Sequence, residues 1–279
     1  MNFLKKLFTK NEQSQQQNKS KEIGKDYIED PIAMVFVKGG KFQATLGSTD
    51  EYGRETVIKK AVSINNFYIG QYPVTQAQWN LVMGEHPEHT EKDNFPVTNV
   101  SWEEVQVFIG KLNKKTGKKY RLPSAQEWEY AATGGNESKG YKYSGSNDAD
   151  KVAWYGENSN YNTHEVGTKQ ANELGIYDMS GNVWEWCNDR WGNYDKLSTF
   201  KGKEAFNILR SVLTATGNHK ALAELDKEEA KTKNIADGAY RVRRGCSCLT
   251  MVEPYVNDSI RFTEVSDASY NDTGFRLAL

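Results

Sequence analysis

The residues best suited to chemistry lie in one short segment, residues 177–187, which reads YDMSGNVWEWC. Trp184 and Trp186 are two positions apart, so in an extended strand both indoles point to one side and Glu185 points to the other. The Ser-Gly-Asn triplet before them is typical of a tight turn. A carboxylate held between a turn and two large rings is either buried and paired, or bound to a cation.

The cysteines form a second candidate set, and the chain has three of them, Cys187, Cys246 and Cys248. An odd, small number is not typical of a secreted disulfide framework. If residues 246–248 form a strand, the sulfurs of Cys246 and Cys248 lie on one face, with Cα atoms roughly 6.6–7 Å apart. That spacing is long for a disulfide but permits two thiolates to hold one soft metal. The favoured interpretation is two small buried thiols that fill space.

A third string of possible ligands consists of His86, His89 and Glu91, between Gly84 and Pro96. Its position between a helix-ending glycine and a proline predicts a surface loop. The chain has four histidines, which leaves few candidates for a further ligand. No Ser/His/Asp triad and no glycine-rich phosphate-binding motif is recognisable in the sequence.

The elements that must position these residues are marked by turn and capping signals. Ser or Thr followed three residues later by Glu or Gln predicts helices that begin after Thr75, Ser101 and Ser124. Two short strands flank Gly39-Gly40 and are expected to form a hairpin. Residues 134–172 are rich in Gly, Asn, Ser and Tyr, which predicts a long irregular region.

Composition excludes several classes of protein. The chain has 279 residues with 36 basic and 37 acidic side chains, and no basic stripe interleaves with aromatic residues, so nucleic acid is not an expected partner. No run approaches the about 20 apolar residues that cross a bilayer. The N-terminus lacks the apolar core of a signal peptide, so we expect a cytoplasmic protein.

Two segments differ from the rest of the chain. Residues 1–30 are amide-rich and charged, which predicts a disordered leader, whereas residues 31–279 read as one folded domain. Within residues 1–10, apolar and basic residues recur at helical spacing, and this is the part of the chain where we expect any membrane contact. Residues 203–233 carry helical patterns and are interpreted as a helical insertion, which either docks on another protein or covers the domain itself.

Taken together, the chain resembles the formylglycine-generating enzyme family, also called sulfatase-modifying factor proteins. The matching text, in family order, is MVFVKGGKFQ, FYIGQYPVTQAQW, PVTNVSWEEVQVFI, YRLPSAQEWEYAA, YSGS, GIYDMSGNVWEWC, RVRRGCS and NDTGFRLAL. The resemblance implies an α+β, C-type-lectin-like fold with little regular secondary structure.

The copper chemistry of that family is not expected here. Its oxidases convert a substrate cysteine into formylglycine, using oxygen and a Cu(I) ion held by two cysteines beyond an RGGS motif. The positions that match this pair are Thr250 and Tyr255, and neither supplies a soft anionic ligand near neutral pH. Two nearby departures are Cys246, in place of the second glycine of RGGS, and Cys248, in place of an aromatic residue.

The resemblance also implies a structural Ca²⁺ ion, held by a side-chain oxygen of Asp178, backbone oxygens of Gly181 and Val183, and Glu185. Hard oxygen donors from a turn suit this cation. The alternative is that Asp178 and Glu185 only cap amides of the turn. Val152 stands where a ligand of a second calcium site is expected.

These observations favour a non-catalytic member of the family that binds a protein or peptide ligand. Relatives on this scaffold include hypervariable ligand-binding proteins whose variation lies in the last sequence block. The expected binding surface comprises Cys248, Thr250, Met251, Glu253 and Tyr255. The alternative is an oxidoreductase that uses Cys246 and Cys248, either for formylglycine formation or for another copper- or iron-dependent oxidation.

Overall fold

The computed structural model describes residues 28–45, 48–49, 55–56, 59–84, 92–190, 240–250 and 261–279. The predictions for the leader up to residue 27, for the His86, His89 and Glu91 string, and for the insertion 203–233 lie outside these residues. Helices and strands are mixed and joined by long irregular segments, so the predicted α+β class is confirmed.

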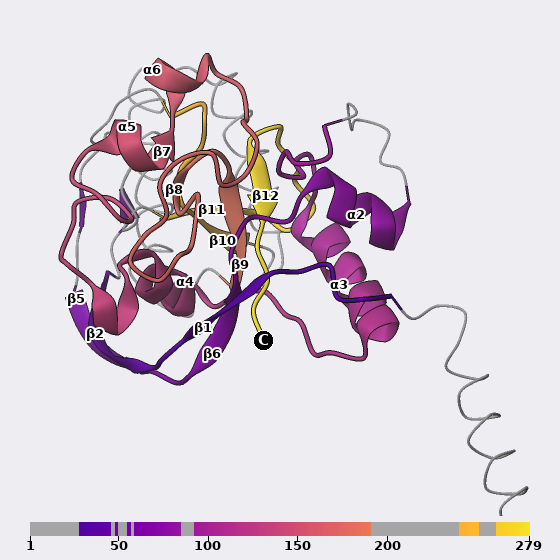
Figure 1. The fold of residues 1–279 in the computed structure, drawn as a ribbon, viewed down its shortest axis with the longest axis horizontal. Coiled ribbons are helices and arrows are strands. Elements are labelled where there is room, and N and C mark those ends of the chain that lie inside the picture. Colours follow the sequence, from indigo (N-terminus) through magenta and orange to yellow (C-terminus); the bar gives the residue numbers. More distant parts are fainter. Residues whose placement is uncertain are drawn as a thin grey trace, which may run out of the picture.

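The strands are short and fall into small sheets (Figure 1). In chain order they are β1 (Met34–Val37), β2 (Gly40–Thr45), β3 (Ser48–Thr49), β4 (Glu55–Thr56), β5 (Lys59–Ile64), β6 (Phe67–Gly70), β7 (Ala153–Trp154), β8 (Ser180–Gly181), β9 (Trp184–Arg190), β10 (Tyr240–Arg244), β11 (Arg261–Val265) and β12 (Thr273–Phe275). The helices are α2 (Gln76–Met83), α3 (Trp102–Thr116), α4 (Ala125–Ala132), α5 (Ala149–Val152) and α6 (Gly156–Ser159), with a 3₁₀ turn η1 (Gly135–Glu137).

The largest sheet has the strand order β11-β10-β9-β12 and places the tryptophan segment at its centre. Strand β9 runs antiparallel to β10 and parallel to β12. In the parallel pair, Thr273 lies opposite Trp184 and Phe275 lies opposite Trp186. Residues near 185 and near 274 are therefore neighbours in space although they are far apart in the sequence.

The hairpin expected around Gly39-Gly40 is wrong. Strand β1 pairs with β6, and β2 pairs with β5, so the two strands that flank the glycines belong to different sheets. The reason is visible at Gly39, where a Cβ atom would lie 2.3 Å from the carbonyl oxygen of Ile64. This glycine permits close approach to another strand rather than a tight hairpin turn.

The three predicted helix starts are confirmed. Thr75, Ser101 and Ser124 each form a complete capping box. The side chain of the cap accepts the N–H of the third helical residue, and the side chain of that residue accepts the N–H of the cap. Helix α3 then ends at Gly117, which has a φ of 70°. Among the described residues, no helix combines the length and the apolar character needed to cross a bilayer.

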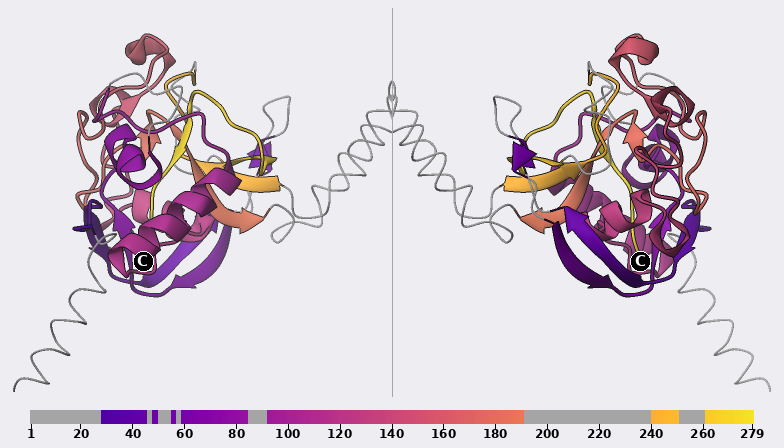
Figure 2. Two further views of the ribbon diagram at one scale, coloured as in Figure 1. Left: turned by 90° about the vertical axis from the view of Figure 1, so that its right-hand side faces the viewer. Right: turned by 90° about the vertical axis from the view of Figure 1, so that its left-hand side faces the viewer.

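Aromatic rings fill the space between α2, α3 and the central sheet. The ring of Trp79 stacks on Phe108 with centroids 5.2 Å apart, and Phe108 meets Phe275 edge-on at 5.3 Å. Such pairs contribute beyond the area they bury, by about 0.5–1.5 kcal/mol each. The core therefore fixes helix α3 against β12 and, through β12, against the tryptophan segment on β9 (Figure 2).

Candidate functional site

The two tryptophans of the central segment share one side of β9, as the alternation predicts. The guanidinium carbon of Arg243, on the neighbouring strand β10, lies 5.8 Å from the Trp184 ring and 5.7 Å from the Trp186 ring. Trp186 is completely buried, and its indole nitrogen donates to the carbonyl of Val100 at 2.9 Å. Trp184 instead packs with Cys246, close to the end of β10.

Glu185 faces the other way and is completely buried. One carboxylate oxygen accepts from Arg276 Nε at 2.6 Å and from Trp128 Nε1 at 2.6 Å. The other oxygen accepts from Arg276 Nη2 at 2.6 Å. This is a bidentate ion pair, the geometry in which arginine holds a carboxylate most firmly. The sequence predicted that this carboxylate is either buried and paired or bound to a cation. In the structure it is buried and paired with Arg276.

The other carboxylate of the segment, Asp178, is also buried, and its backbone has a φ of 57°. One oxygen accepts from the backbone N–H of Gly167 at 2.7 Å. Burial raises the pKa of this carboxyl to about 6, and the charge of Glu185 adds to the rise, whereas Arg276 opposes it. Asp178 thus lacks the strong cationic partner that Glu185 has.

The predicted calcium set can be tested against these positions. Val183 is completely buried, and Gly181 has a φ of 84°, with Trp154 so close that a Cβ atom would lie 2.3 Å from its carbonyl oxygen. Both oxygens of Glu185 already accept protein donors, so a cation at this carboxylate would have to compete with Arg276. The described residues contain no group of three or more His, Cys, Asp or Glu side chains placed to hold a metal. Calcium binding therefore stays a prediction.

The turn before the tryptophans connects distant parts of the chain. The N–H of Asn182 donates to Trp154 at 2.7 Å, its carbonyl accepts from Cys248 at 2.9 Å, and its side chain bonds both backbone groups of His164. The N–H of Gly181 donates to the carbonyl of Gly245 at 2.7 Å. Asn182 has a φ of 61°, a left-handed conformation that asparagine tolerates better than most residues. Local backbone strain of this kind gathers at functional sites.

Residues 245–250, which we name the terminal turn, follow directly after β10. Residues 246–248 do not form the strand that would place both sulfurs on one face, because β10 ends at Arg244 and Cys246 has a φ of 62°. Ser247 fixes the turn by donating from its hydroxyl to Asp272 at 2.7 Å. The hydroxyl of Thr250 accepts a hydrogen bond from the N–H of Ser247 at 3.1 Å. The backbone carbonyl of Thr250 accepts one from the N–H of Gly156 at 2.8 Å.

The two thiols of the terminal turn are buried, and none of the three cysteines, all of which lie in the described residues, forms a disulfide. Burial raises the pKa of Cys248 to about 12 and that of Cys187 well above its ordinary value. Cys248 is therefore a protonated thiol near neutral pH. Of the predicted binding surface, Cys248 and Thr250 lie in this turn, whereas Met251, Glu253 and Tyr255 lie outside the described residues.

The protein-family model described as "Sulfatase-modifying factor enzyme 1-like domain" matches residues 19–279 of this chain. The chain belongs to this family. The predicted resemblance to formylglycine-generating enzymes is thus confirmed, as is the fold that it implied.

Two curated proteins and one solved structure are among those that this chain resembles. "Chaperone protein LppX" of Paenibacillus barcinonensis is 35% identical over 204 residues, covering 55% of this chain and 70% of that protein. "Inactive C-alpha-formylglycine-generating enzyme 2" of Bos taurus is 31% identical over 134 residues, or 44% of this chain and 42% of its own length. The solved structure of "Treponema denticola variable protein 1" superposes with a TM-score of 0.64 at 25% identity, covering 88% of this chain and 94% of that one.

One feature of this family member escaped the sequence reasoning. The rings of Trp154 and His164 stack with centroids 3.7 Å apart, and the Lys169 ammonium lies 3.9 Å from the Trp154 ring centroid. Ser159 joins this stack to the terminal turn. Its backbone carbonyl lies 3.0 Å from His164 Nε2, and its hydroxyl donates to the backbone carbonyl of Cys248 at 2.8 Å. No sequence pattern marks a stack whose members lie in an irregular loop.

A buried cation was missed as well. The Arg243 side chain is 11% exposed, donates to the Thr273 hydroxyl at 2.7 Å and lies 3.7 Å from Glu264. The ring of Tyr270 is 4.9 Å from its guanidinium carbon. Burial lowers the pKa of this guanidinium, while the charges of Asp272 and Glu264 oppose that change. Arg243 therefore supports the strand end from which the terminal turn departs.

Proposed function

We propose that this member of the sulfatase-modifying factor family binds a peptide or protein ligand at the terminal turn and does not carry out copper-dependent cysteine oxidation. The observation that carries the proposal is the position of Thr250. By the sequence match, it replaces a copper-binding cysteine of the oxidases, and its hydroxyl accepts the N–H of Ser247 at 3.1 Å. A hydroxyl that closes a turn organises the backbone and offers no soft anionic donor.

The remaining sulfur atoms support the same proposal. The thiolate, not the thiol, binds soft metals and attacks electrophiles. With a pKa of about 12, Cys248 supplies almost no thiolate near neutral pH. Cys246 is completely buried beside Trp184. Two buried thiols that replace a glycine and an aromatic residue are explained by packing, because free cysteine behaves as a small apolar residue.

The surface around the turn is suited to holding a ligand. Leu249 projects from it with 36% of its surface exposed. The Trp154 and His164 stack lies alongside, joined to the turn through Ser159. An exposed apolar side chain, neighbouring aromatic rings and a rigid backbone provide contact area at little entropic cost. The inactive relative and the chaperone relative, as they are named, show that the family includes proteins not named as oxidases.

Binding can be tested with a phage-displayed library of random peptides. We expect peptides to be enriched on the purified protein and to lose binding to the Leu249→Arg variant. The matched control is Val107→Arg on helix α3, because Val107 is 51% exposed and far from the turn in the sequence. If the selected peptides bind both variants as well as the original protein, or if no peptide is enriched, the terminal turn is not the binding site.

The oxidase alternative has its own test. The purified protein is incubated with Cu(I), a CxPxR peptide and oxygen. Formylglycine is measured by mass spectrometry, and bound copper is measured after desalting. We expect no turnover and no tightly bound copper. A Thr250→Cys, Tyr255→Cys double variant is expected to gain Cu(I) binding at one ion per chain. Turnover by the unmodified protein that disappears in Cys246→Ser would overturn the proposal and establish the oxidase.

A further inference from the structure

The C-terminal half of helix α3 and the turn after it carry a cluster of lysines. Between Glu104 and Glu127 the sequence has no acidic residue. Four lysines there are exposed, and a fifth, Lys115, is half-buried and donates to the carbonyl of Leu81 at 3.2 Å. The exposed ones are Lys111, Lys114, Lys118 and Lys119. A positive surface of this density attracts an anionic partner.

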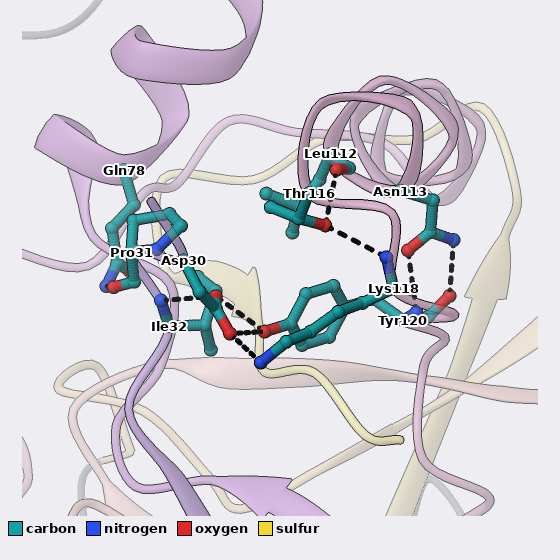
Figure 3. Close-up of polar contacts among 9 residues, drawn as sticks. All are labelled: Asp30, Pro31, Ile32, Gln78, Leu112, Asn113, Thr116, Lys118 and Tyr120. Carbon is teal, nitrogen blue, oxygen red and sulfur yellow. Dashed lines mark hydrogen bonds and ion pairs between the residues drawn. The ribbon is translucent and has the colours of Figure 1, made fainter. Parts of the chain in front are cut away.

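The start of the described chain is fastened beside this cluster, as Figure 3 shows. The hydroxyl of Tyr120 lies 2.6 Å from both oxygens of Asp30, and the ammonium of Lys118 forms an ion pair with the same carboxylate. The N–H of Ile28 donates to the carbonyl of Lys115 at 3.1 Å. Ile28, where the described chain begins, therefore lies at the lysine-rich end of the domain.

An exposed aromatic pair lies at the same end of the molecule. Phe36 on β1 and Tyr68 on β6 are 49% and 47% exposed, and their ring centroids are 5.2 Å apart. The backbone of Tyr68 bonds Leu279 at 3.2 Å, and Arg121, just after the lysines, bonds Ala278 at 3.0 Å. Figures 1 and 2 place β1, β6 and the C-terminal end of α3 together along the lower edge.

The sequence of the leader matches this surface. Phe3, Leu4, Leu7 and Phe8 alternate with Lys5, Lys6 and Lys10. A short basic and apolar segment binds a bilayer weakly by itself, so stable attachment requires a second contact. The lysines and the aromatic pair supply one. Aromatic rings are favoured at the level of the lipid headgroups, whereas ammonium groups pair with anionic headgroups.

We propose that this end of the molecule docks on an anionic phospholipid bilayer. The docking surface is the basic end, defined as Lys111, Lys114, Lys118 and Lys119 with Phe36 and Tyr68. An acidic protein would satisfy the lysines alone. The apolar residues of the leader and the exposed ring pair favour a partner that offers both negative charge and hydrocarbon. The proposal is independent of the ligand proposed at the terminal turn.

The test is vesicle co-sedimentation with the full chain. Vesicles of phosphatidylcholine alone are compared with vesicles of an equal mixture of phosphatidylcholine and phosphatidylglycerol, at low and high salt. We expect binding to the anionic vesicles only, and weaker binding at high salt. The triple variant Lys111→Gln, Lys114→Gln, Lys119→Gln is expected to bind roughly tenfold more weakly or worse. It leaves the Lys118 anchor to Asp30 intact.

A matched control removes three exposed lysines from another part of the fold. Lys41, Lys59 and Lys60 on β2 and β5 are exposed, and their change to Gln alters the net charge equally. This control should bind as the original protein does. A Phe36→Ser, Tyr68→Ser variant should lose a smaller part of the affinity, and that part should persist at high salt.

Several results would overturn the proposal. These are no binding to anionic vesicles, equal binding to neutral ones, or equal losses in the two lysine variants. Loss of all binding on deletion of residues 1–27, with full binding by the α3 lysine variant, would assign the contact to the leader alone. Binding to immobilised polyglutamate but not to vesicles would instead identify an acidic protein as the partner. Circular dichroism of each variant verifies folding.

Discussion

Charged groups occur in two contrasting regions of this molecule. In the interior, Glu185 and Arg276 are completely buried and paired at 2.6 Å, and Arg244 pairs with Glu129 at 2.8 Å with both side chains buried. At the basic end, Lys111 and Lys114 of helix α3 are exposed to solvent. The difference teaches that desolvation decides the role of a charge. Inside, a charge must find one specific partner, whereas outside it stays available for recognition.

Breaking the interior pair should have the largest effect. In Glu185→Gln, Arg276 keeps a buried positive charge without its counterion, and we expect the free energy of unfolding to fall by about 3–5 kcal/mol. The measurement is urea unfolding followed by tryptophan fluorescence. The control is Glu127→Gln, whose partner Arg121 has a 41% exposed side chain, and where the loss should stay below about 1 kcal/mol. Equal losses would show that burial does not set the energy of these pairs.

Asp178 sharpens the comparison, because it is buried like Glu185 but has no guanidinium bonded to it. Since burial raises its pKa to about 6, the unfolded chain releases this proton first as the pH rises. The contribution of Asp178 to stability is thus complete below about pH 4 and falls as the pH rises to about 6. Asp178→Asn should flatten this part of the profile and raise stability at neutral pH by about 1–3 kcal/mol.

Unfolding experiments at a series of pH values check this prediction, with Glu129→Gln as a variant that removes a paired buried carboxylate instead. Glu129→Gln should lower stability at neutral pH, because Arg244 then loses its partner. If Asp178→Asn also lowers stability at neutral pH, the carboxylate has a cationic partner in solution.

Calcium removal should have the smallest effect. Because both oxygens of Glu185 are bonded to Arg276, we expect EGTA to leave the melting temperature unchanged. The predicted calcium set gives the opposite result. A melting temperature that falls with EGTA, recovers with Ca²⁺ and no longer responds in Asp178→Asn would establish the ion at this turn. Elemental analysis of the purified protein gives the stoichiometry.

Local signals were sufficient to predict part of this structure. Each capping box involves residues three positions apart, so Thr75, Ser101 and Ser124 marked their helices without any tertiary information. The alternation around Glu185 likewise predicted which side of β9 its neighbours occupy. The partner of Glu185 could not be predicted, because Arg276 is 91 positions away and reaches it only through the parallel pairing of β9 with β12.

The errors have the same cause. The glycines at 39 and 40 are typical of a hairpin, but Gly39 is needed where strands from different sheets approach. Cys246 and Cys248 look like a strand pair, but the N–H of Cys248 bonds Asn182 and bends the chain into a turn. In both cases a contact with a distant segment overrides the local preference. The Trp154 and His164 stack depends entirely on such contacts.

The late position of Arg276 has a consequence for biosynthesis. A ribosome makes the Glu185 carboxylate long before it makes the guanidinium that neutralises it, and β12 itself spans only Thr273–Phe275. Until that stretch leaves the exit tunnel, the centre of the domain cannot close around its lone negative charge without a large desolvation cost. The centre of the domain is therefore expected to close only after Arg276 has left the ribosome, and a chain cut short before residue 276 is expected to be open to proteases.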